Sequence, residues 1–294
     1  MKEGKIDQMS GVYRSVLAES KRVAAAWKLG ALSPHPSQRM GAYMTSRAGS
    51  SAEFLDQRPF SRGDDIRHIN WQAFARTEQV MINLFQQESA PILDIIIDCS
   101  ESMSFQEDKW KGAWKLWAFL MNLSQDSGSR VRAFLVCGSE WVEVPSEDPE
   151  AGFVFLINAD PGAPSGVLKV PFTPKSFRVF ISDLLFEELS QEIPACFARG
   201  SGGFSMVAPF VSEEASPAWA GNIEFHDVEN GQKLTHLCDT AFIQRYQNRY
   251  KAHFNAWDEA IQKQGGTLSR VDSKMPLSKA ISASLARCGM VVPR

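Results

Sequence analysis

A short, almost continuous apolar run, Ile92–Ile97, constrains the fold more than any other stretch of this 294-residue chain. Its length and β-branched content indicate a strand buried on both faces, because a half-buried strand alternates polar and apolar residues. A Trp- and Leu-rich helical pattern follows over 105–127, and a second strand pattern over 130–137. This alternation continues toward the C-terminus. The sequence therefore predicts an α/β fold with a doubly wound, mostly parallel sheet and helices on both faces.

The part of the chain before this sheet has a different character. Residues 1–38 predict an amphipathic helix, at about 6–30, followed by the breaker-rich linker SPHPSQ. Residues 39–90 have poor periodicity and indicate a β- and loop-rich extension, with a strand near 80–85. Residues 91–294 hold the alternating strands and the C-terminal helices. We therefore expect three segments: an N-terminal helix with its linker, the extension, and the sheet domain.

Composition narrows the class of protein and its compartment. Charged residues make up 22% of the chain and the net charge is −3, so no overall field favours nucleic acid or an anionic membrane surface. No apolar run approaches the roughly 18 residues that a membrane-spanning helix needs. The five cysteines are scattered without a Cys-x-x-Cys pair, which is typical of a reducing compartment. We expect a cytoplasmic protein that neither spans a membrane nor binds nucleic acid.

Polar residues follow the buried strand directly. Asp98 ends it and Ser100 and Ser102 come next, while Asp183 follows another apolar strand pattern at 177–182. In an open α/β sheet, ligand sites lie beyond the carboxyl ends of strands, where the strand order reverses. Acids and hydroxyls there supply the oxygen ligands that Mg²⁺, Ca²⁺ or Mn²⁺ prefer. The structural alternative is that the serines only cap the helix that follows.

Two stretches of this sequence are similar to known families. The run DCSES after an apolar strand, with ISDLL downstream, resembles the von Willebrand factor A domain and its metal-ion-dependent adhesion site. Upstream, the spacing Arg-Pro-Phe-x-x-Gly-Asp-Asp-x-Arg-x-Ile-x-Trp within residues 53–88 resembles the signature of a bacterial family, domain of unknown function fifty-eight. Members of that family are often encoded beside MoxR-type AAA+ ATPases. EFHDVENGQ, at 224–232, is similar to a turn near the end of the same domain, so the likeness covers about residues 40–240.

The resemblance implies a fold, a cofactor and a partner. The fold would be of von Willebrand factor A type, and the protein a non-enzymatic interaction module that binds a divalent cation, most readily Mg²⁺, with Ca²⁺ and Mn²⁺ as alternatives. The implied metal ligands are Asp98, Ser100, Ser102 and Asp183. Such sites usually add a threonine ligand from a loop that follows a second helix; in the stretch 146–175 Ser165 or Thr173 would have to replace it, and neither lies in a Gly-Gly-Thr turn. The partner would be a MoxR-type AAA+ ATPase or its client, with a carboxylate that completes the ion's shell.

Charged and aromatic residues crowd the segment that carries the Gly-Asp-Asp signature. They are Arg58, Arg62, Asp64, Asp65, Arg67, Trp71 and Arg76. The acids can neutralise their arginine neighbours, so the first hypothesis is a polar network that holds the segment in shape. The second is a docking surface, because Arg and Trp anchor protein interfaces. The adjacent acids argue against nucleic-acid binding, which the interleaved basic and aromatic residues alone would permit.

An enzyme is the alternative to a binding module. A divalent-metal-dependent hydrolase would use Asp98 or Cys99. A cysteine nucleophile needs a base, usually histidine, and none of the five histidines has a telling context. The sequence also lacks a Gly-x-Ser-x-Gly elbow and a phosphate loop. We therefore expect a protein without enzymatic activity.

Overall fold

The chain is described here from a computed structural model, which covers residues 2–30, 52–61, 64–87, 92–146, 148–159, 162–186, 188–226 and 233–294. The chain divides into two compact units, residues 1–35 with 91–294 and residues 36–90. The N-terminal helix therefore belongs to the unit of the sheet, whereas the sequence predicts a segment of its own for residues 1–38. The physical reason is packing, since side chains of this helix lie in the core of the sheet unit.

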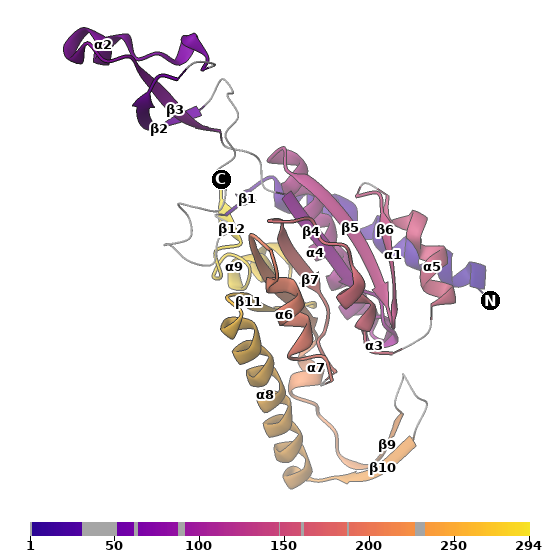
Figure 1. Cartoon of the computed structure of the whole chain (residues 1–294). Coiled ribbons are helices and arrows are strands. Elements are labelled where there is room, and N and C mark those ends of the chain that lie inside the picture. Colours follow the sequence, from indigo (N-terminus) through magenta and orange to yellow (C-terminus); the bar gives the residue numbers. More distant parts are fainter. Residues whose placement is uncertain are drawn as a thin grey trace. The chain divides into compact units, whose positions relative to one another are not determined.

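A six-stranded sheet forms the centre of the first unit, in the order β11-β8-β7-β4-β5-β6 (Figure 1). Its strands are β4 (Ile92–Asp98), β5 (Arg130–Cys137), β6 (Glu140–Val144), β7 (Phe177–Ile181), β8 (Gly203–Phe210) and β11 (Thr267–Asp272). All neighbours are parallel except β6, which pairs antiparallel with β5. The tight turn between these two contains Gly138, whose φ of +53° suits glycine. The predicted α/β fold with a mostly parallel sheet is confirmed.

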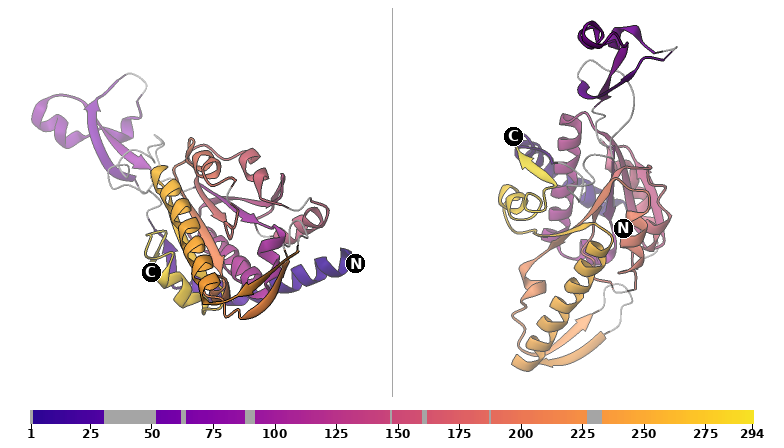
Figure 2. Two further views of the ribbon diagram at one scale, coloured as in Figure 1. Left: turned by 90° about the horizontal axis from the view of Figure 1, so that it is seen from below. Right: turned by 60° about the vertical axis from the view of Figure 1, so that its left-hand side comes forward.

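Strand β4 is buried on both faces, which explains its nearly continuous apolar sequence. Leu93, Ile95 and Ile97 lie in one hydrophobic cluster and Ile96 lies in the other. Helices α1 (Lys2–Ala24), α4 (Glu107–Asp126), α5 (Phe153–Asn158) and α9 (Leu277–Ala283) contribute to the first cluster, and α6 (Glu192–Ala198) and α8 (Thr240–Lys263) to the second. The views in Figure 2 show these helices on both sides of the sheet.

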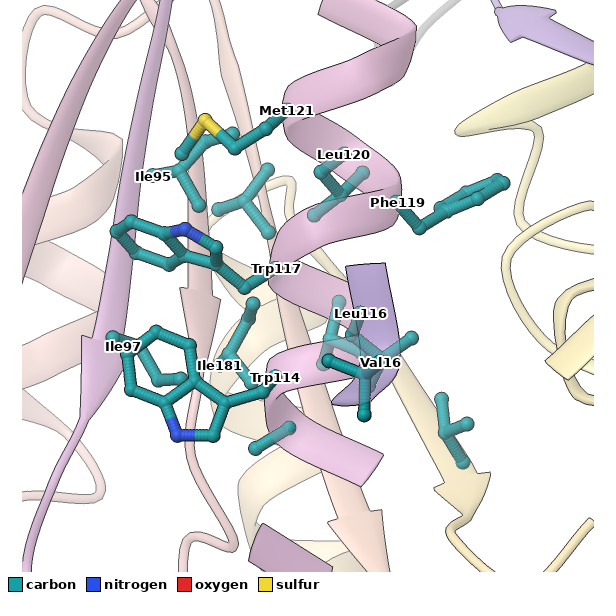
Figure 3. Close-up of a cluster of buried hydrophobic side chains, with 14 of the residues drawn as sticks. Val16, Ile95, Ile97, Trp114, Leu116, Trp117, Phe119, Leu120, Met121 and Ile181 are labelled. Carbon is teal, nitrogen blue, oxygen red and sulfur yellow. The ribbon is translucent and has the colours of Figure 1, made fainter. Parts of the chain in front are cut away.

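Helix α4 carries much of the first cluster. Trp114 and Trp117 are fully buried and point toward Ile95 and Ile97 of β4 (Figure 3). On another side of the same helix, Leu116 lies beside Val16 of α1. A helix with apolar side chains on more than one side needs cover on more than one side. The N-terminal helix supplies this cover.

One acid interrupts the apolar sequence of β4. Asp94 is fully buried and accepts hydrogen bonds from the Thr173 amide (2.6 Å), the Thr173 hydroxyl (3.0 Å) and the Ser176 hydroxyl (2.7 Å). Buried polar groups need such partners, and a carboxylate makes the stronger hydrogen bonds. Asp94 therefore fastens the loop that precedes β7 to the amino end of β4.

Shorter elements complete the first unit. Strand β1 (Trp27–Leu29) pairs with β12 (Val291–Pro293), and β9 (Gly221–His226) and β10 (Lys233–Cys238) form a hairpin outside the central sheet. The remaining helical elements are α3 (Glu101–Phe105), α7 (Ser212–Ala215) and the 3-10 turns Pro149–Gly152 and Ser165–Lys169. Helix α1 ends at Ala24 rather than near residue 30, because the residues after it join the β1–β12 pair.

The second unit is a β-hairpin that encloses two short helical elements. Strands β2 (Ala52–Pro59) and β3 (Met81–Gln87) pair antiparallel, with a register shift between Phe54 and Asp56. Between them lie the 3-10 turn Ile66–His68 and helix α2 (Trp71–Thr77). The side chain of Asn70 caps α2 by accepting from the Ala73 amide (2.9 Å). In neither unit is there a helix, within the part of the chain described, that is long and apolar enough to cross a membrane.

Val16→Ala should destabilise the whole first unit. Val16 is 2% exposed and belongs to the core cluster beneath α4, so removing its two methyl groups should cost about 1.5–3 kcal/mol. Urea unfolding followed by tryptophan fluorescence measures this difference. The control is Ser15→Ala on the exposed side of the same helix, with an expected change below about 0.5 kcal/mol. Equal stability of the Val16→Ala variant and the parent protein would show that α1 lies outside the cooperative core.

Candidate functional site at the carboxyl edge of the sheet

The strand order reverses at β4. From β4 the chain passes to β5 on one side, and it returns later as β7 on the other side. The loops that follow β4 and β7 therefore leave the same edge as neighbours, which is where open α/β sheets bind ligands. Asp98 ends β4, and Ser182 and Asp183 directly follow β7. The topology brings the predicted acids of the two loops to one edge.

Asp98 is fully buried, and both of its carboxyl oxygens accept hydrogen bonds. Oδ1 accepts from the Ser100 amide (2.9 Å) and Oδ2 from the Ser182 hydroxyl (2.7 Å). Burial raises the pKa of Asp98 to about 7, and the negative charge of Asp183 adds to the rise, while the hydrogen bonds from Ser182 and Ser100 oppose it. At neutral pH a substantial fraction of Asp98 therefore carries its proton.

The two serines of the loop bond to each other. Ser100 is buried, and its hydroxyl lies 3.0 Å from that of the half-buried Ser102. Ser100 occupies the position just before α3, as the capping alternative requires, yet its side chain makes no hydrogen bond to the helix backbone. The serines therefore join a local hydroxyl pair instead of capping α3 through their side chains.

Sequence reasoning missed a lysine that binds Asp183. The Lys109 side chain, in the first turn of α4, is 3% exposed, and its Nζ donates to Asp183 Oδ2 (2.8 Å) and Glu214 Oε1 (2.8 Å). Burial alone lowers the pKa of Lys109, but Asp183 and Glu214 outweigh this effect and hold that pKa above its ordinary value. The sequence pattern that could have indicated its burial is helical spacing. Lys109 lies four and eight residues before the buried Ala113 and Trp117, on the apolar side of the helix.

The backbone after Asp183 is held in an uncommon conformation. Leu184 has a φ of +56°, a left-handed region that costs a side-chain-bearing residue about 1–3 kcal/mol. Its amide donates to the Ser182 hydroxyl (3.1 Å), and its carbonyl oxygen lies 2.6 Å from Nε2 of His253 in α8. The Asp183 amide donates to the thioether sulfur of Met103 in α3 (3.1 Å). The loops of the site are thereby held against both α3 and α8.

These contacts do not fit a divalent ion held between Asp98 and Asp183. Such an ion needs free oxygen ligands at about 2.0–2.6 Å. The Asp98 oxygens are engaged by Ser100 and Ser182, and Lys109 already brings a positive charge to Asp183. Across the described ranges, no group of three or more His, Cys, Asp or Glu side chains is placed to hold a metal. The ion stays a prediction of the sequence that this geometry does not favour.

Thr173 does not reach this edge, which corrects one expectation. It bonds to Asp94, which lies four residues before Asp98 and hence roughly 13 Å away along an extended strand. Thr173 is committed to the opposite end of β4, where it satisfies a buried carboxylate. Ser165 begins the 3-10 turn that contacts the β5–β6 turn, where the Gly166 amide donates to the Gly138 carbonyl oxygen (2.8 Å).

Cys99 lies inside the site loop, but it is buried. Burial raises the pKa of its thiol well above the ordinary value, and the negative charge of Asp98 acts in the same direction. A cysteine nucleophile reacts as the thiolate, which a raised pKa suppresses. This environment disfavours the hydrolase alternative at Cys99.

The acids of the second unit pair with its arginines. Arg58 binds both carboxylate oxygens of Asp64 (2.7 and 2.8 Å), which also accepts from the Ser61 amide (2.8 Å). Asp65 caps the 3-10 turn and pairs with Arg67 (2.6 Å), and the hydrogen bonds from Arg67 lower the pKa of Asp65 to about 2. The polar-network hypothesis accounts for these four charged side chains.

The other residues of that predicted cluster have different surroundings. Trp71 is 65% exposed and packs edge to face on Phe74, with ring centroids 6.2 Å apart. Arg76 donates to the Gln72 carbonyl oxygen within α2 (3.3 Å). Arg62 lies outside the described residues. Trp71 is therefore an exposed aromatic member of the cluster, as the docking hypothesis requires.

Comparison with known proteins gives one clear relationship. Residues 56–256 match the profile of a family described as "Protein of unknown function DUF58". Among solved structures, an aerotolerance-related membrane protein from Bacteroides fragilis is similar, with 16% identity, a TM-score of 0.41, and coverage of 67% of this chain and 100% of that chain. The conserved hypothetical protein BatB from Bacteroides thetaiotaomicron is similar with 19% identity, a TM-score of 0.39, and coverage of 68% and 98%. No curated protein matches the chain.

Asp98→Asn should gain stability relative to the parent protein as the pH rises from about 4 to about 7. An acid whose pKa is raised on folding stabilises the fold most while it is protonated, and this contribution is lost as the pH rises through the folded-state pKa of about 7. Asparagine has no proton to lose, so the ratio of the two unfolding constants should change by up to about tenfold per pH unit in this window. Urea unfolding of both proteins across this range measures it, and parallel pH profiles would contradict the raised pKa.

Proposed function

Since this chain belongs to the DUF58 family of proteins of unknown function, we propose that it is a non-enzymatic protein-binding module that docks its partner at the carboxyl edge of its central sheet. The proposal is carried by the contrast between buried charge and exposed apolar surface at this edge. Phe105 is 69% exposed and Leu185 is 41% exposed, whereas the acids beside them are buried and bonded within the protein. Apolar side chains exposed next to a rigid polar network are typical of a docking surface.

Phe105 and Leu185 form what we call the carboxyl-edge surface. Phe105 ends α3 and Leu185 lies in the loop after β7. Phe105 lies two residues after Met103, and Leu185 lies two residues after Asp183. The Asp183 amide donates to the Met103 sulfur, so the two segments are neighbours. Because both side chains stand on hydrogen-bonded segments, their backbone should lose little conformational entropy when a partner covers them.

The burial of the reactive groups supports binding over catalysis. A catalytic base or nucleophile must come within hydrogen-bonding reach of its substrate. Asp98 is fully buried and Cys99 is 9% exposed, so neither is offered to a substrate in this conformation. The hydroxyls of Ser100 and Ser102 lie beside them and bond to each other (3.0 Å).

We propose a MoxR-type AAA+ ATPase, or its client, as the partner. The support is the resemblance of residues 53–88 to the family signature. A von Willebrand factor A-type fold and a cytoplasmic location belong to the same proposal; the second is supported by five free cysteines, three of which are buried. In the second unit, the exposed Trp71 would provide a further anchor for the partner.

The double variant Phe105→Ala/Leu185→Ala should weaken capture of a purified MoxR-type ATPase by at least about tenfold, because truncating central apolar anchors typically costs more than 1 kcal/mol each. Binding to the immobilised protein measures this effect. Val154→Ala removes a side chain that is 58% exposed on α5, and it should leave the affinity unchanged. Trp71→Ala tests the second unit in the same assay. Full affinity in the double variant would refute docking at this edge.

Capture should also persist in EDTA. Asp183 is paired with Lys109, and Asp98 accepts from hydroxyl and amide donors, so these two acids do not require an ion to hold them in place. Loss of capture in EDTA, restored by Mg²⁺, would replace this proposal with the ion-dependent adhesion that the sequence predicts.

A further inference from the structure

We propose that Lys109 is the resident cation of this edge, a lysine ammonium that neutralises Asp183, one of the four predicted ion ligands, together with Glu214. Lys109 is fixed to α4, whereas a bound ion would depend on its concentration in the surroundings. The buried positive charge of Lys109 pairs with Asp183 and Glu214 whether or not a partner docks at the carboxyl-edge surface.

Two carboxylates converge on the ammonium of Lys109. Asp183 leaves the sheet after β7, and Glu214 belongs to α7, which follows β8. Carboxylate oxygens of both lie 2.8 Å from the single Nζ atom of Lys109. Oxygen ligands of Ca²⁺ lie at about 2.3–2.6 Å, so an ion at the same point would draw the two carboxylates inward by only a few tenths of an ångström. The ammonium occupies a point that is already shaped for a cation.

Lys109 and its two acids are shielded from solvent. The Lys109 and Asp183 side chains are 3% and 2% exposed, and that of Glu214 is 14% exposed. Two carboxylates at this depth repel each other strongly unless a positive charge lies between them. With the ammonium in place, a divalent ion at the same carboxylates would meet a like charge in a poorly screened environment. Lysine and ion therefore exclude each other.

The contacts around Lys109 connect several elements at the carboxyl edge. Lys109 joins α4 to the loop after β7 and to α7. Glu214 extends the connection, because its carbonyl oxygen accepts from the Tyr246 hydroxyl of α8 (2.7 Å) and its Oε2 accepts from the Val211 amide (3.4 Å). One ammonium thus connects helices from both faces of the sheet at its carboxyl edge, as an ion bound by the same acids would.

The decisive experiment removes the lysine and supplies an ion. Lys109→Ala leaves Asp183 and Glu214 facing a vacated space, so the variant should melt well below the parent protein and should gain affinity for Ca²⁺ or Mg²⁺. At an ion concentration about 100-fold above its dissociation constant, its melting temperature should rise by about 5–10 °C. The melting temperature of the parent protein should not change with Ca²⁺, Mg²⁺ or EDTA at constant ionic strength. Calorimetric titration of both proteins gives an independent reading of ion binding.

Three variants separate this effect from a general response to salt. Lys109→Met removes the charge but fills the space, so it should be destabilised without rescue by the ion. Lys109→Ala/Glu214→Gln lacks one of the two acids and should lose most of the rescue. Lys111→Ala removes a partly exposed lysine of the same helix, which pairs with Glu107, and it should behave as the parent protein does.

Two results would overturn the proposal. The first is a Lys109→Ala protein that folds but neither binds nor is stabilised by the ions. The second is a parent protein that binds Ca²⁺ or Mg²⁺ with an affinity that Asp183→Asn abolishes. Should Lys109→Ala fail to fold with and without ions, titration of the parent protein decides, since a flat titration supports a resident lysine and saturable binding at Asp183 refutes it. Neither reading depends on capture of a partner.

Discussion

Both faces of strand β4 are buried, so each carboxyl group on this strand needs hydrogen-bond donors from within the protein. Asp94 takes them from Thr173 and Ser176 in the loop before β7, and Asp98 takes one from Ser182 in the loop after β7. The loops at both ends of β7 are therefore hydrogen-bonded to acids of β4. The position of Asp183, and with it the whole carboxyl edge, follows from this fastening.

Two acids at one edge have different environments because their neighbours differ. The Lys109 ammonium forms an ion pair with Asp183. Asp98 accepts hydrogen bonds from a hydroxyl and an amide, and the negative charge of Asp183 repels its ionised form. Burial is the main cause that raises the pKa of Asp98, and the negative charge of Asp183 adds to it. Lys109 of α4 therefore sets the charge beside Asp183, while burial largely sets the protonation of Asp98.

Local patterns predicted the parts of this structure that depend on neighbours in sequence. The buried strand, the strand-end acids and the alternation of strands and helices all followed from periodicity. The β1–β12 pair did not, because it joins Trp27 to Pro293 across nearly the whole chain. Lys109 was missed for the same reason, since its role requires Glu214, whose placement depends on the sheet order. Thr173 cannot serve as a ligand at the carboxyl edge because its hydroxyl donates to the buried Asp94. No local sequence pattern reveals this contact.

The β1–β12 pair has a mechanical consequence. Residues 36–90 are inserted between β1 and β4, so the covalent chain carries a force on this insertion to those two strands of the first unit. Strand β1 is held by three residue pairs to a short partner, whereas β4 is hydrogen-bonded along both edges to β5 and β7. A pull on the insertion loads both strands at once, and β1, with three residue pairs, should detach from β12 before β4 leaves the sheet.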